Sequence, residues 1–430
     1  MNYKSFIFKN YFFNKDLKTL ELNYSLDNQL FFSEKYIFNF DFANYDEAVL
    51  DHAFQDLFLM AGISYFKTCV PKNITIENIE LDKNQAAFFS KIYQKGLGEF
   101  FYINKLDPNT KVNFPITNSA DTTFNLNLGD GFLIGIGGGK DSLVVSEALR
   151  NKADRVFSWS LNHRDKLEPL INRIDLSHFY IERVIDPRLL ELNKEGALNG
   201  HVPISAIISF VGVIVAILSN TKDIVVGNEQ TANEPNLVYN GVPINHQYSK
   251  SQEYEDDLIN YLNLKYKSGI RYYSFLRPLS EMRIAEIFAK SYFNKYKDVF
   301  SSCNRAFHLD SNHLFWCGEC PKCAFIFLIL TPFVDKNELL KLWQGKNLLL
   351  TPELQPTYQA LLGIQGDKPL DCVGEVKESR AAMRMAQDIY PELKELYQFD
   401  LPGDYDYRKV YADSMPDEIR SIFNEFSSQF

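Results

Sequence analysis

The chain has 430 residues, of which 46% are hydrophobic and 23% charged, a composition ordinary for a soluble protein that buries a core. This length exceeds that of a typical single compact domain, so we expect two domains or one core with large additions. A formal net charge of −10 argues against a broad nucleic-acid-binding face, and we do not expect a nucleic-acid partner.

No segment has the pattern of a secretory signal or of a membrane span. Residues 1–10 carry two lysines but no sustained apolar stretch. The most apolar run, residues 204–218, is shorter than the roughly 18 to 20 residues that cross a bilayer. Three small residues also interrupt this run, namely Ser205, Ser209 and Gly212. We therefore expect a buried helix there, no membrane partner and a cytoplasmic protein.

The N-terminal region, residues 1–127, alternates short aromatic-rich runs with polar turns. A two-residue period over residues 36–42 predicts a strand. Helical patterns follow near residues 45–65 and 84–96. We expect this region to form a separate α+β domain, whose role the sequence does not reveal.

From about residue 128, apolar strands alternate with helices. Residues 132–136 form an apolar run that ends in glycines, and apolar residues at helical spacing follow over 143–149. Further strands are predicted at residues 156–161, 179–184, 224–227 and 272–276, with the apolar helix 204–218 between the second and third of these. This alternation predicts an α/β domain over residues 128–330 with a doubly wound parallel sheet.

Ligands of such sheets bind at the carboxyl ends of the strands. Residues 137–142 and residues 227–234 both follow a predicted strand directly, so we expect them at this edge. The C-terminal region has a helical pattern that several prolines interrupt, and we expect a helical part over residues 331–430.

The glycine loop after the first central strand has the composition of a phosphate-binding turn. Three glycines let the backbone turn tightly and direct several N–H groups at one anion, with a helix N-terminus behind them. We expect the lysine and serine to add a charge and a hydroxyl donor, and we expect a magnesium ion between the aspartate and the phosphates. The alternative is a glycine-rich turn without a ligand. The loop residues are Gly137, Gly138, Gly139, Lys140, Asp141 and Ser142.

Four of the six cysteines follow the pattern C-x13-C-x2-C-x2-C. Thiolates on tight turns can converge on one tetrahedral ion, and the distant first cysteine can close the set. Gly318 and Pro321 favour such turns. We expect a structural zinc site, with reduced buried thiols or redox chemistry as the alternatives. The four residues are Cys303, Cys317, Cys320 and Cys323.

The loop of residues 137–142 resembles the SGGxDS loop of the PP-loop ATP pyrophosphatases, with glycine in place of the first serine. The resemblance implies an adenine nucleotide alpha hydrolase-like fold that cleaves ATP between the α and β phosphates and adenylylates a substrate oxygen. It also implies that the adenine lies near residues 157–160, and hence near Ser158. One member, 7-cyano-7-deazaguanine synthase, carries a similar cysteine-rich zinc site. This similarity supports the expected zinc site, and it also makes the activity of that synthase an alternative function for this chain.

Three further segments narrow the resemblance: residues 227–234, 274–281 and 316–323. Together with the loop, they resemble the UDP-N-acetylmuramoyl-L-alanyl-L-glutamate epimerase family of bacterial cell-wall synthesis, over roughly residues 130–380. The resemblance implies an isomerase that inverts the terminal L-glutamate of UDP-N-acetylmuramoyl-L-Ala-L-Glu for peptidoglycan synthesis and converts ATP to AMP and pyrophosphate. Lys140 and Asp141 are then the expected catalytic residues of the activation step.

Three residues outside the loop are expected to bind the substrate: Glu229, Arg277 and Arg283. Guanidinium groups match carboxylates and diphosphates, and Glu229 follows a strand end, where it can hold magnesium or the substrate amide. The alternatives are surface salt bridges for the arginines and a solvated loop for Glu229. The oligomeric state is not predicted.

The acid and base that move the α-proton are not identified by sequence. The candidates are His163, His201, His246, Asp371 and Cys372, and each has an ordinary structural role as its alternative. Two other function classes also stay open, namely a nucleobase-modifying or tRNA-modifying PP-loop enzyme and a nucleotide-binding regulatory module. The charge of −10 disfavours a tRNA enzyme, and the Lys-Asp-Ser sequence disfavours a module without catalysis.

Overall fold

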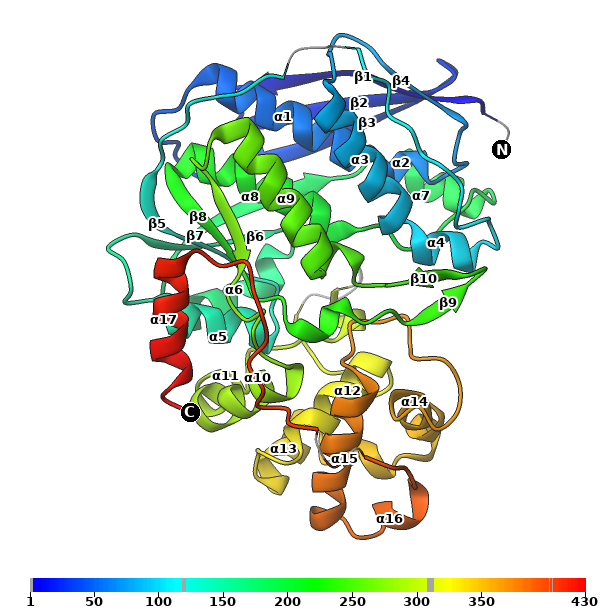
Figure 1. Ribbon diagram of the computed structural model, residues 1–430, viewed down its shortest axis with the longest axis vertical. Helices are drawn as coiled ribbons and strands as arrows, with labels where there is room; N and C mark the ends of the chain where they lie inside the picture. Colours follow the sequence, from blue (N-terminus) through cyan, green and yellow to red (C-terminus); the bar gives the residue numbers. More distant parts are fainter. Residues whose placement is uncertain (1–2, 118–120, 308–312, 402, 404) are drawn as a thin grey trace.

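The computed structural model describes residues 3–117, 121–307, 313–401, 403 and 405–430. Its main feature is a nine-stranded sheet in the order β11-β8-β5-β6-β7-β3-β2-β1-β4 (Figure 1). The strands are β1 (Ser5–Asn14), β2 (Thr19–Leu26), β3 (Leu30–Phe38), β4 (Asn73–Ile76), β5 (Gly129–Gly135), β6 (Val156–Leu161), β7 (Ser177–Val184), β8 (Thr221–Val226) and β11 (Arg271–Ser274). A separate two-stranded hairpin pairs β9 (Leu237–Tyr239) with β10 (Val242–Ile244).

Within the nine-stranded sheet, β5, β6, β7, β8 and β11 pair in parallel, as predicted for an α/β fold. The chain runs from β5 outward through β6 to β7, and then returns to add β8 and β11 on the other side of β5. The order therefore reverses between β5 and β8, which makes their carboxyl ends the expected ligand-binding edge. The connecting helices are α5 (Lys140–Leu149), α6 (Arg164–Ile174), α7 (Pro187–Lys194), α8 (Ile204–Ser219) and α9 (Gln252–Tyr266).

The N-terminal strands extend this same sheet. β3 pairs antiparallel with β7 through residues 35–38, so the N-terminal strands cover what would otherwise be an open strand edge. One hydrophobic cluster also contains residues of both regions, including Tyr24, Phe58 and Phe210. The expectation of a separate domain over residues 1–127 differs from the structure, because a two-residue period predicts a strand but not its pairing partner. The helices here are α1 (Glu47–Ala61), α2 (Ile63–Phe66), α3 (Lys83–Gly96) and α4 (Gly98–Ile103).

The strand expected at residues 36–42 ends at Phe38 in the structure. Phe40 and Phe42 continue the alternating pattern outside the strand, and the Phe40 ring lies 4.5 Å from that of Phe179 on β7. The alternation thus comes from aromatic side chains that pack beside the sheet after the chain has left it.

The C-terminal region is helical, as predicted, and most of it before the last helix lies in the lower part of the molecule in Figure 1. Its helices share a second hydrophobic cluster with α5 and α10, which includes Leu143, Ile284 and Phe327. The last helix returns to the sheet, where Phe423 contacts Phe275 at a ring distance of 5.6 Å. The helices that follow β11 are α10 (Glu281–Ile287), α11 (Phe293–Tyr296), α12 (Pro321–Leu330), α13 (Lys336–Leu342), α14 (Gln355–Leu361), α15 (Val376–Ile389), α16 (Leu393–Leu396) and α17 (Asp417–Ser427).

The apolar run at residues 204–218 is a buried helix, as expected, and forms α8. Over the parts of the chain that the structure describes, no helix combines the length and apolar character needed to cross a bilayer.

Candidate functional site

The glycine loop connects β5 to α5 at the point where the strand order reverses. Gly138 has a φ of +90°, and a Cβ there would lie 3.0 Å from the carbonyl oxygen of Ser301. Gly139 is the N-cap of α5, and a Cβ there would lie 3.2 Å from the Cβ of Ser302. A Cβ on Gly137 would meet nothing within 4 Å. The loop is therefore packed on one side and open at Gly137. At this position the SGGxDS loop that it resembles has a serine.

The first residues of α5 carry the charged groups of the loop. Lys140 is only 2% exposed, and its ammonium group donates to Asp141 and to Glu281 at the start of α10. These carboxylates raise the pKa of Lys140 although burial alone would lower it, so the side chain stays charged. The Ser142 hydroxyl donates to the Gly139 carbonyl at 3.1 Å. The predicted loop residues thus lie together at one helix N-terminus.

Glu229 lies beside this loop as a third carboxylate, and like Glu281 it is buried. It follows β8, whose end approaches the loop so closely that a Cβ on Gly227 would lie 3.2 Å from the Asp141 backbone. Burial and the charges of Glu281 and Asp141 raise the pKa of Glu229 to about 7. Over the described residues, its carboxylate has no hydrogen-bond or ion-pair partner, and it is only 7% exposed. Neighbouring carboxylates whose charge is not fully compensated, as at Asp141 and Glu229, are typical of a cation site.

Arg277 has a different role from the expected one. It is fully buried, and its guanidinium group donates to Glu255 at 2.7 Å and to the carbonyl oxygens of Glu229 and Lys250, both at 2.6 Å. Its terminal nitrogens are therefore used within the protein, where they hold the two segments that carry Glu229 and Lys250. The short pattern Leu-Arg-Pro does not reveal whether an arginine faces a ligand or the protein interior.

Arg283 and Ser158 also lie apart from the loop. Arg283 donates to Glu286 at 2.6 Å, in a group that includes Lys290 and Arg408. Ser158 is fully buried within β6, and its hydroxyl lies 2.8 Å from Nδ1 of His178. The structure thus places neither side chain among the charged groups of the loop.

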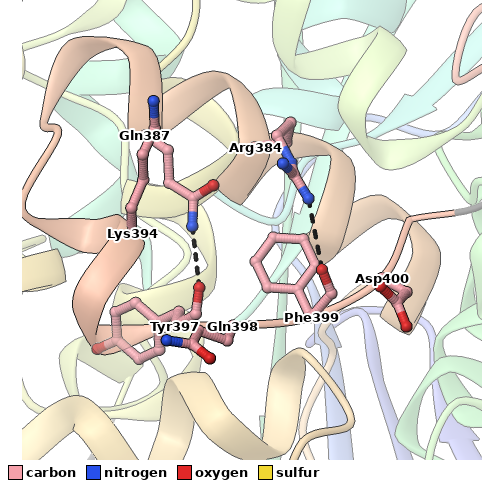
Figure 2. Close-up of a pocket in the computed structure, with 7 residues that line it drawn as sticks. All are labelled: Arg384, Gln387, Lys394, Tyr397, Gln398, Phe399 and Asp400. Carbon is pink, nitrogen blue, oxygen red and sulfur yellow. Dashed lines mark hydrogen bonds between the residues drawn. The ribbon is translucent and has the colours of Figure 1, made fainter.

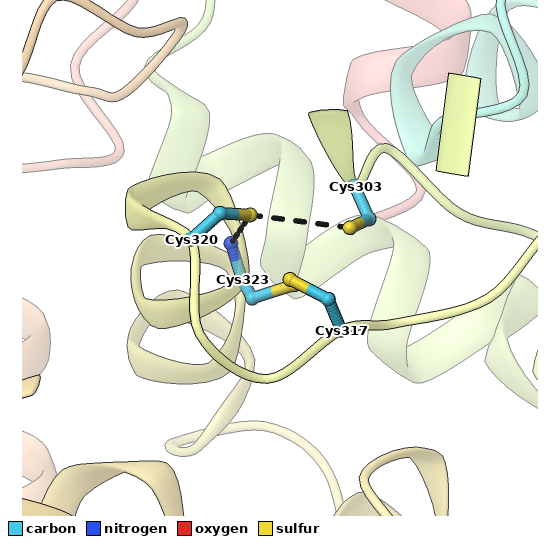
Figure 3. A group of neighbouring side chains, drawn as sticks. All are labelled: Cys303, Cys317, Cys320 and Cys323. Carbon is cyan, nitrogen blue, oxygen red and sulfur yellow. Dashed lines mark hydrogen bonds between the residues drawn. The ribbon is translucent and has the colours of Figure 1, made fainter. Parts of the chain in front are cut away.

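The four predicted cysteines converge, as Figure 3 shows. Their sulfur atoms all lie within 4.8 Å of one another. Gly318, with a φ of +69°, turns the chain between the second and third cysteine. Cys320 then caps α12, where its sulfur accepts from the Cys323 N–H at 3.4 Å. Four thiols around one point match the donor set of a closed tetrahedral zinc site.

A second group of reactive side chains surrounds Cys372, in the loop between α14 and α15. Lys250 Nζ donates to the Cys372 sulfur at 3.3 Å, and His246 also hydrogen bonds with this thiol. His246 Nδ1 in turn bonds with the Glu99 carboxylate, and the His201 ring lies 4.4 Å from the His246 ring. We call these five residues the Cys372 group.

Two lysines connect the Cys372 group with the glycine loop. Lys322 on α12 lies 3.5 Å from the Glu281 carboxylate, and its ammonium group donates to the Cys372 carbonyl oxygen. Lys250, which contacts the thiol directly, also interacts electrostatically with Glu229 and Asp141. The two groups are therefore neighbouring parts of one charged site.

The remaining proton-transfer candidates separate in the structure. Asp371 lies next to Cys372, and its carboxylate accepts from Asn304. His163 caps α6, and its ring lies 5.2 Å from that of Phe307. The structure therefore groups His201, His246 and Cys372, places Asp371 near His246, and gives His163 other neighbours.

Several members of this site were not predicted. Lys250 and Glu99 lie in no recognisable motif, and Lys322 and Glu281 were noted only as parts of the segments at residues 316–323 and 274–281. Lysines and glutamates are common on protein surfaces, so their sequence position alone carries little information. Their burial beside one another is what distinguishes them.

Two hollows lie outside the glycine loop. One, of about 500 Å³, lies at the end of α15, where Gln387 donates to the Tyr397 carbonyl at 3.0 Å (Figure 2). No expected site residue lines it. The other, of about 750 Å³, is lined by α3, α9 and the β9–β10 hairpin and includes Gly98 and Asn245. These two residues are the chain neighbours of Glu99 and His246, so this hollow adjoins the segments of the Cys372 group.

Two family models match most of the chain. Residues 1–275 match the family model described as the MurL N-terminal domain, and residues 299–395 match that of the MurL C-terminal domain. The junction between the two matches therefore differs from the boundaries expected at residues 127 and 330.

Curated relatives cover most of the chain. A UDP-N-acetyl-alpha-D-muramoyl-L-alanyl-L-glutamate epimerase of Xanthomonas oryzae is 40% identical over 364 residues, or 80% of each chain. Proteins of the same name from Salinispora tropica and a Micromonospora species are each 38% identical. These two matches cover 79% of this chain and 74% and 75% of theirs. The chain therefore belongs to the MurL family of UDP-N-acetyl-alpha-D-muramoyl-L-alanyl-L-glutamate epimerases.

Proposed function

We propose that this chain is an ATP-dependent epimerase that inverts the terminal L-glutamate of UDP-N-acetylmuramoyl-L-Ala-L-Glu in cytoplasmic peptidoglycan precursor synthesis. Family membership supports the substrate and the inversion. The observation that supports ATP use is the open glycine loop at the strand-order reversal, with Lys140 and two partly uncompensated carboxylates beside it.

The glycine loop is suited to bind pyrophosphate as it leaves ATP. Glycine backbone N–H groups and the α5 N-terminus attract phosphate oxygens, and Lys140 is the first residue of this helix. In this role Lys140 exchanges part of its contact with Asp141 and Glu281 for the phosphates. This arrangement corresponds to a PP-loop fold, in which ATP is a substrate that ends as AMP and pyrophosphate.

The residues beside the loop fit a magnesium ion. Asp141 and Glu229 would hold it, because Asp141 is a partly exposed carboxylate of the loop and the buried Glu229 carboxylate lacks a protein partner within the described residues. Magnesium prefers such oxygen ligands, and when bound it would neutralise phosphate charge near the site of adenylylation. Arg277 contributes by holding the backbone of Glu229 in place.

Adenylylation explains why an epimerase would use ATP. Removing a proton next to a free carboxylate puts a second negative charge on an anion, which makes that proton very weakly acidic. Conversion of the carboxylate to an acyl phosphate removes the first charge and withdraws electrons, so proton removal becomes feasible. Reprotonation from the opposite face and hydrolysis then give the D-epimer. This sequence requires a proton-transfer group near the loop.

The four-cysteine group is proposed to hold a structural zinc ion. All four ligand positions would be filled by thiolates, which leaves none for a substrate and is typical of structural sites. Zinc there would fix the start of α12 and hence Lys322, two positions after Cys320. A similar site also belongs to the nucleobase-modifying alternative, but the family match supports the epimerase.

One assay tests the proposal directly. The protein is incubated with ATP, magnesium and UDP-N-acetylmuramoyl-L-Ala-L-Glu, and both pyrophosphate release and the chirality of the glutamate are measured. We expect pyrophosphate release that depends on the dipeptide, together with D-glutamate. Asp141→Asn is expected to reduce pyrophosphate release at least about 100-fold, as loss of a transition-state charge contact does. Asp154→Asn, on an exposed residue after α5, is the matched control. Normal release by the Asp141 variant would contradict the role of the loop.

A further inference from the structure

We propose that Cys372 is a catalytic residue of the epimerisation step, the group that exchanges the α-proton of the glutamate, with His246 and Lys250 as its positioning residues. This inference rests on the proposed function and identifies the proton-transfer part of the same site.

The contacts of Cys372 differ from those of an ordinary buried cysteine. Its sulfur accepts from Lys250 Nζ at 3.3 Å and shares a hydrogen bond with His246. The Glu99 carboxylate in turn holds the His246 ring through a hydrogen bond with its Nδ1. These partners come from α4, the segment after β10 and the loop before α15, so the tertiary fold assembles them around one sulfur atom.

The charges around the sulfur favour the thiolate. Burial would raise the pKa of Cys372, but the positive charges of Lys250, His246 and Lys322 lower it to about 6. Burial would lower the pKa of His246, but its bonds with Cys372 and Glu99 raise it to about 9. Near neutral pH the pair is therefore a thiolate beside an imidazolium, the form in which a cysteine accepts a proton. The other titratable neighbours of His246 are His201 and Asp371.

The position of Cys372 suits a proton next to the activated carboxyl group. The α-carbon is one bond from the carboxyl carbon, so its base must lie close to the substrate held at the glycine loop. Lys322 joins the Cys372 carbonyl to Glu281, which in turn bonds with Lys140 of the loop. Lys250 faces both the thiol and the acidic groups beside the loop. An acyl phosphate at the loop therefore brings its α-carbon towards this sulfur.

In the proposed step the Cys372 thiolate accepts the proton from the α-carbon. The C–H bond breaks, an S–H bond forms, and the electron pair moves into the carbonyl of the acyl phosphate to give a planar enolate. A general acid on the opposite face then donates a proton to the α-carbon, which returns the electron pair and inverts the centre. Hydrolysis releases AMP, and both groups regain their starting protonation from solvent.

A single-turnover experiment in deuterium oxide tests this step. Wild type, Cys372→Ala and Cys372→Ser are mixed with ATP, magnesium and UDP-N-acetylmuramoyl-L-Ala-L-Glu. Pyrophosphate release, D-glutamate and deuterium at the α-carbon are followed together. We expect the ratio of epimerisation to pyrophosphate release to fall at least about 100-fold in both variants, the usual effect of losing a general base. Cys69→Ala is the matched control, because Cys69 lies outside the site.

The outcomes separate this inference from the proposed function. Epimerisation by the Cys372 variants within threefold of wild type would overturn the role of the thiol alone. Equal loss of epimerisation and pyrophosphate release in a folded variant would also overturn it, because the thiol would then serve activation. Thiol-dependent epimerisation without pyrophosphate would support Cys372 and overturn adenylylation. A wild-type chain that forms neither product would overturn both.

A measurement on the wild-type chain covers the case in which the variants fail to fold. Iodoacetamide is added near pH 7, and the labelled cysteines are identified by mass spectrometry of peptides. We expect alkylation of Cys372 to abolish epimerisation in proportion to its extent, and ATP with the dipeptide to slow this labelling. Full epimerisation by a chain alkylated at Cys372 would contradict the proposal.

His246 is tested as a positioning residue through a pH profile. His246→Gln removes the positive charge beside the thiol while it keeps a polar side chain. We expect the pH at which Cys372 labelling is half-maximal to rise above the wild-type value, since the thiolate loses a stabilising partner. A variant with lower activity but an unchanged labelling profile would assign His246 a purely structural role and overturn its part in the proposal.

Discussion

Cysteines occupy two regions of this molecule with different neighbours. In the four-cysteine group the neighbours are other thiols, with sulfur distances of 3.9 Å between Cys303 and Cys320 and 3.7 Å between Cys317 and Cys323. The sulfur of Cys372 instead faces the ammonium group of Lys250 and the ring of His246. A set of thiols suits a metal ion, whereas a single thiol beside cations suits proton transfer. Neighbouring groups, more than residue type, thus decide the chemistry.

The two regions also differ in how they are assembled. Three of the four clustered cysteines lie within one turn and the start of α12, so local sequence largely determines their approach. The Cys372 group draws on Glu99, Lys250 and a loop more than 100 residues further along the chain. Its geometry therefore depends on the whole fold, and the predictions below separate the two cases.

The largest expected difference concerns stability and metal content. Cys320→Ser should lose zinc and lower the free energy of unfolding by on the order of 5 kcal/mol or more, because structural zinc binding contributes up to about 10–16 kcal/mol in small domains. Cys372→Ser should retain zinc and unfold within a few degrees of wild type. Metal analysis and thermal unfolding measure both. Equal stability of the two variants would remove the distinction between the regions.

Thiol reactivity should differ by a smaller factor. With zinc bound, iodoacetamide should label Cys372 at least about tenfold faster than any cysteine of the four-cysteine group, because the metal occupies their thiolates. After treatment with a strong chelator, the four cysteines should become reactive as well. Peptide mass spectrometry reports each site separately. Rapid labelling of Cys317 or Cys320 before chelation would show that these thiols carry no metal.

The pH dependence of epimerisation should follow the Cys372–His246 pair. Because the pKa of Cys372 is lowered to about 6, the thiolate is lost as the pH falls through this value, and the rate should drop about tenfold per pH unit below it. Because the pKa of His246 is raised to about 9, the imidazolium is lost as the pH rises above that value. A bell-shaped pH profile of kcat/KM is expected. Its acidic and basic limbs report the titration of Cys372 and His246 as a coupled pair. A kcat/KM that stays constant between pH 5 and 7 would contradict the role of the Cys372 thiolate.

The smallest effect is expected for the lysine beside the thiol. Lys250→Gln should raise the pH of half-maximal Cys372 labelling by about one unit, which corresponds to about 1.4 kcal/mol of lost thiolate stabilisation. The matched control is Lys346→Gln, on an exposed lysine of the C-terminal region. Identical labelling profiles for both variants would show that Lys250 does not stabilise the thiolate.

Much of the parallel sheet and its helices could be predicted. The apolar runs that became β6 and α8 agree with the structure to within a residue, because buried strands and helices carry a strong hydrophobic pattern. The union of the N-terminal strands with the same sheet could not be predicted. Strand pairing between residues 35–38 and 181–184 depends on backbone groups that every residue shares.

Local sequence by itself determined the glycine loop and the convergence of three of the four cysteines, Cys317, Cys320 and Cys323. The conformational freedom of glycine, the capping of α12 by Cys320 and short-range turns act within a few residues, so their spacing suffices. Only the tertiary structure decided that Arg277 faces inward and that Cys372 meets Lys250 and His246. Electrostatic partners act through space, and a chain segment carries no record of which distant charge will lie beside it.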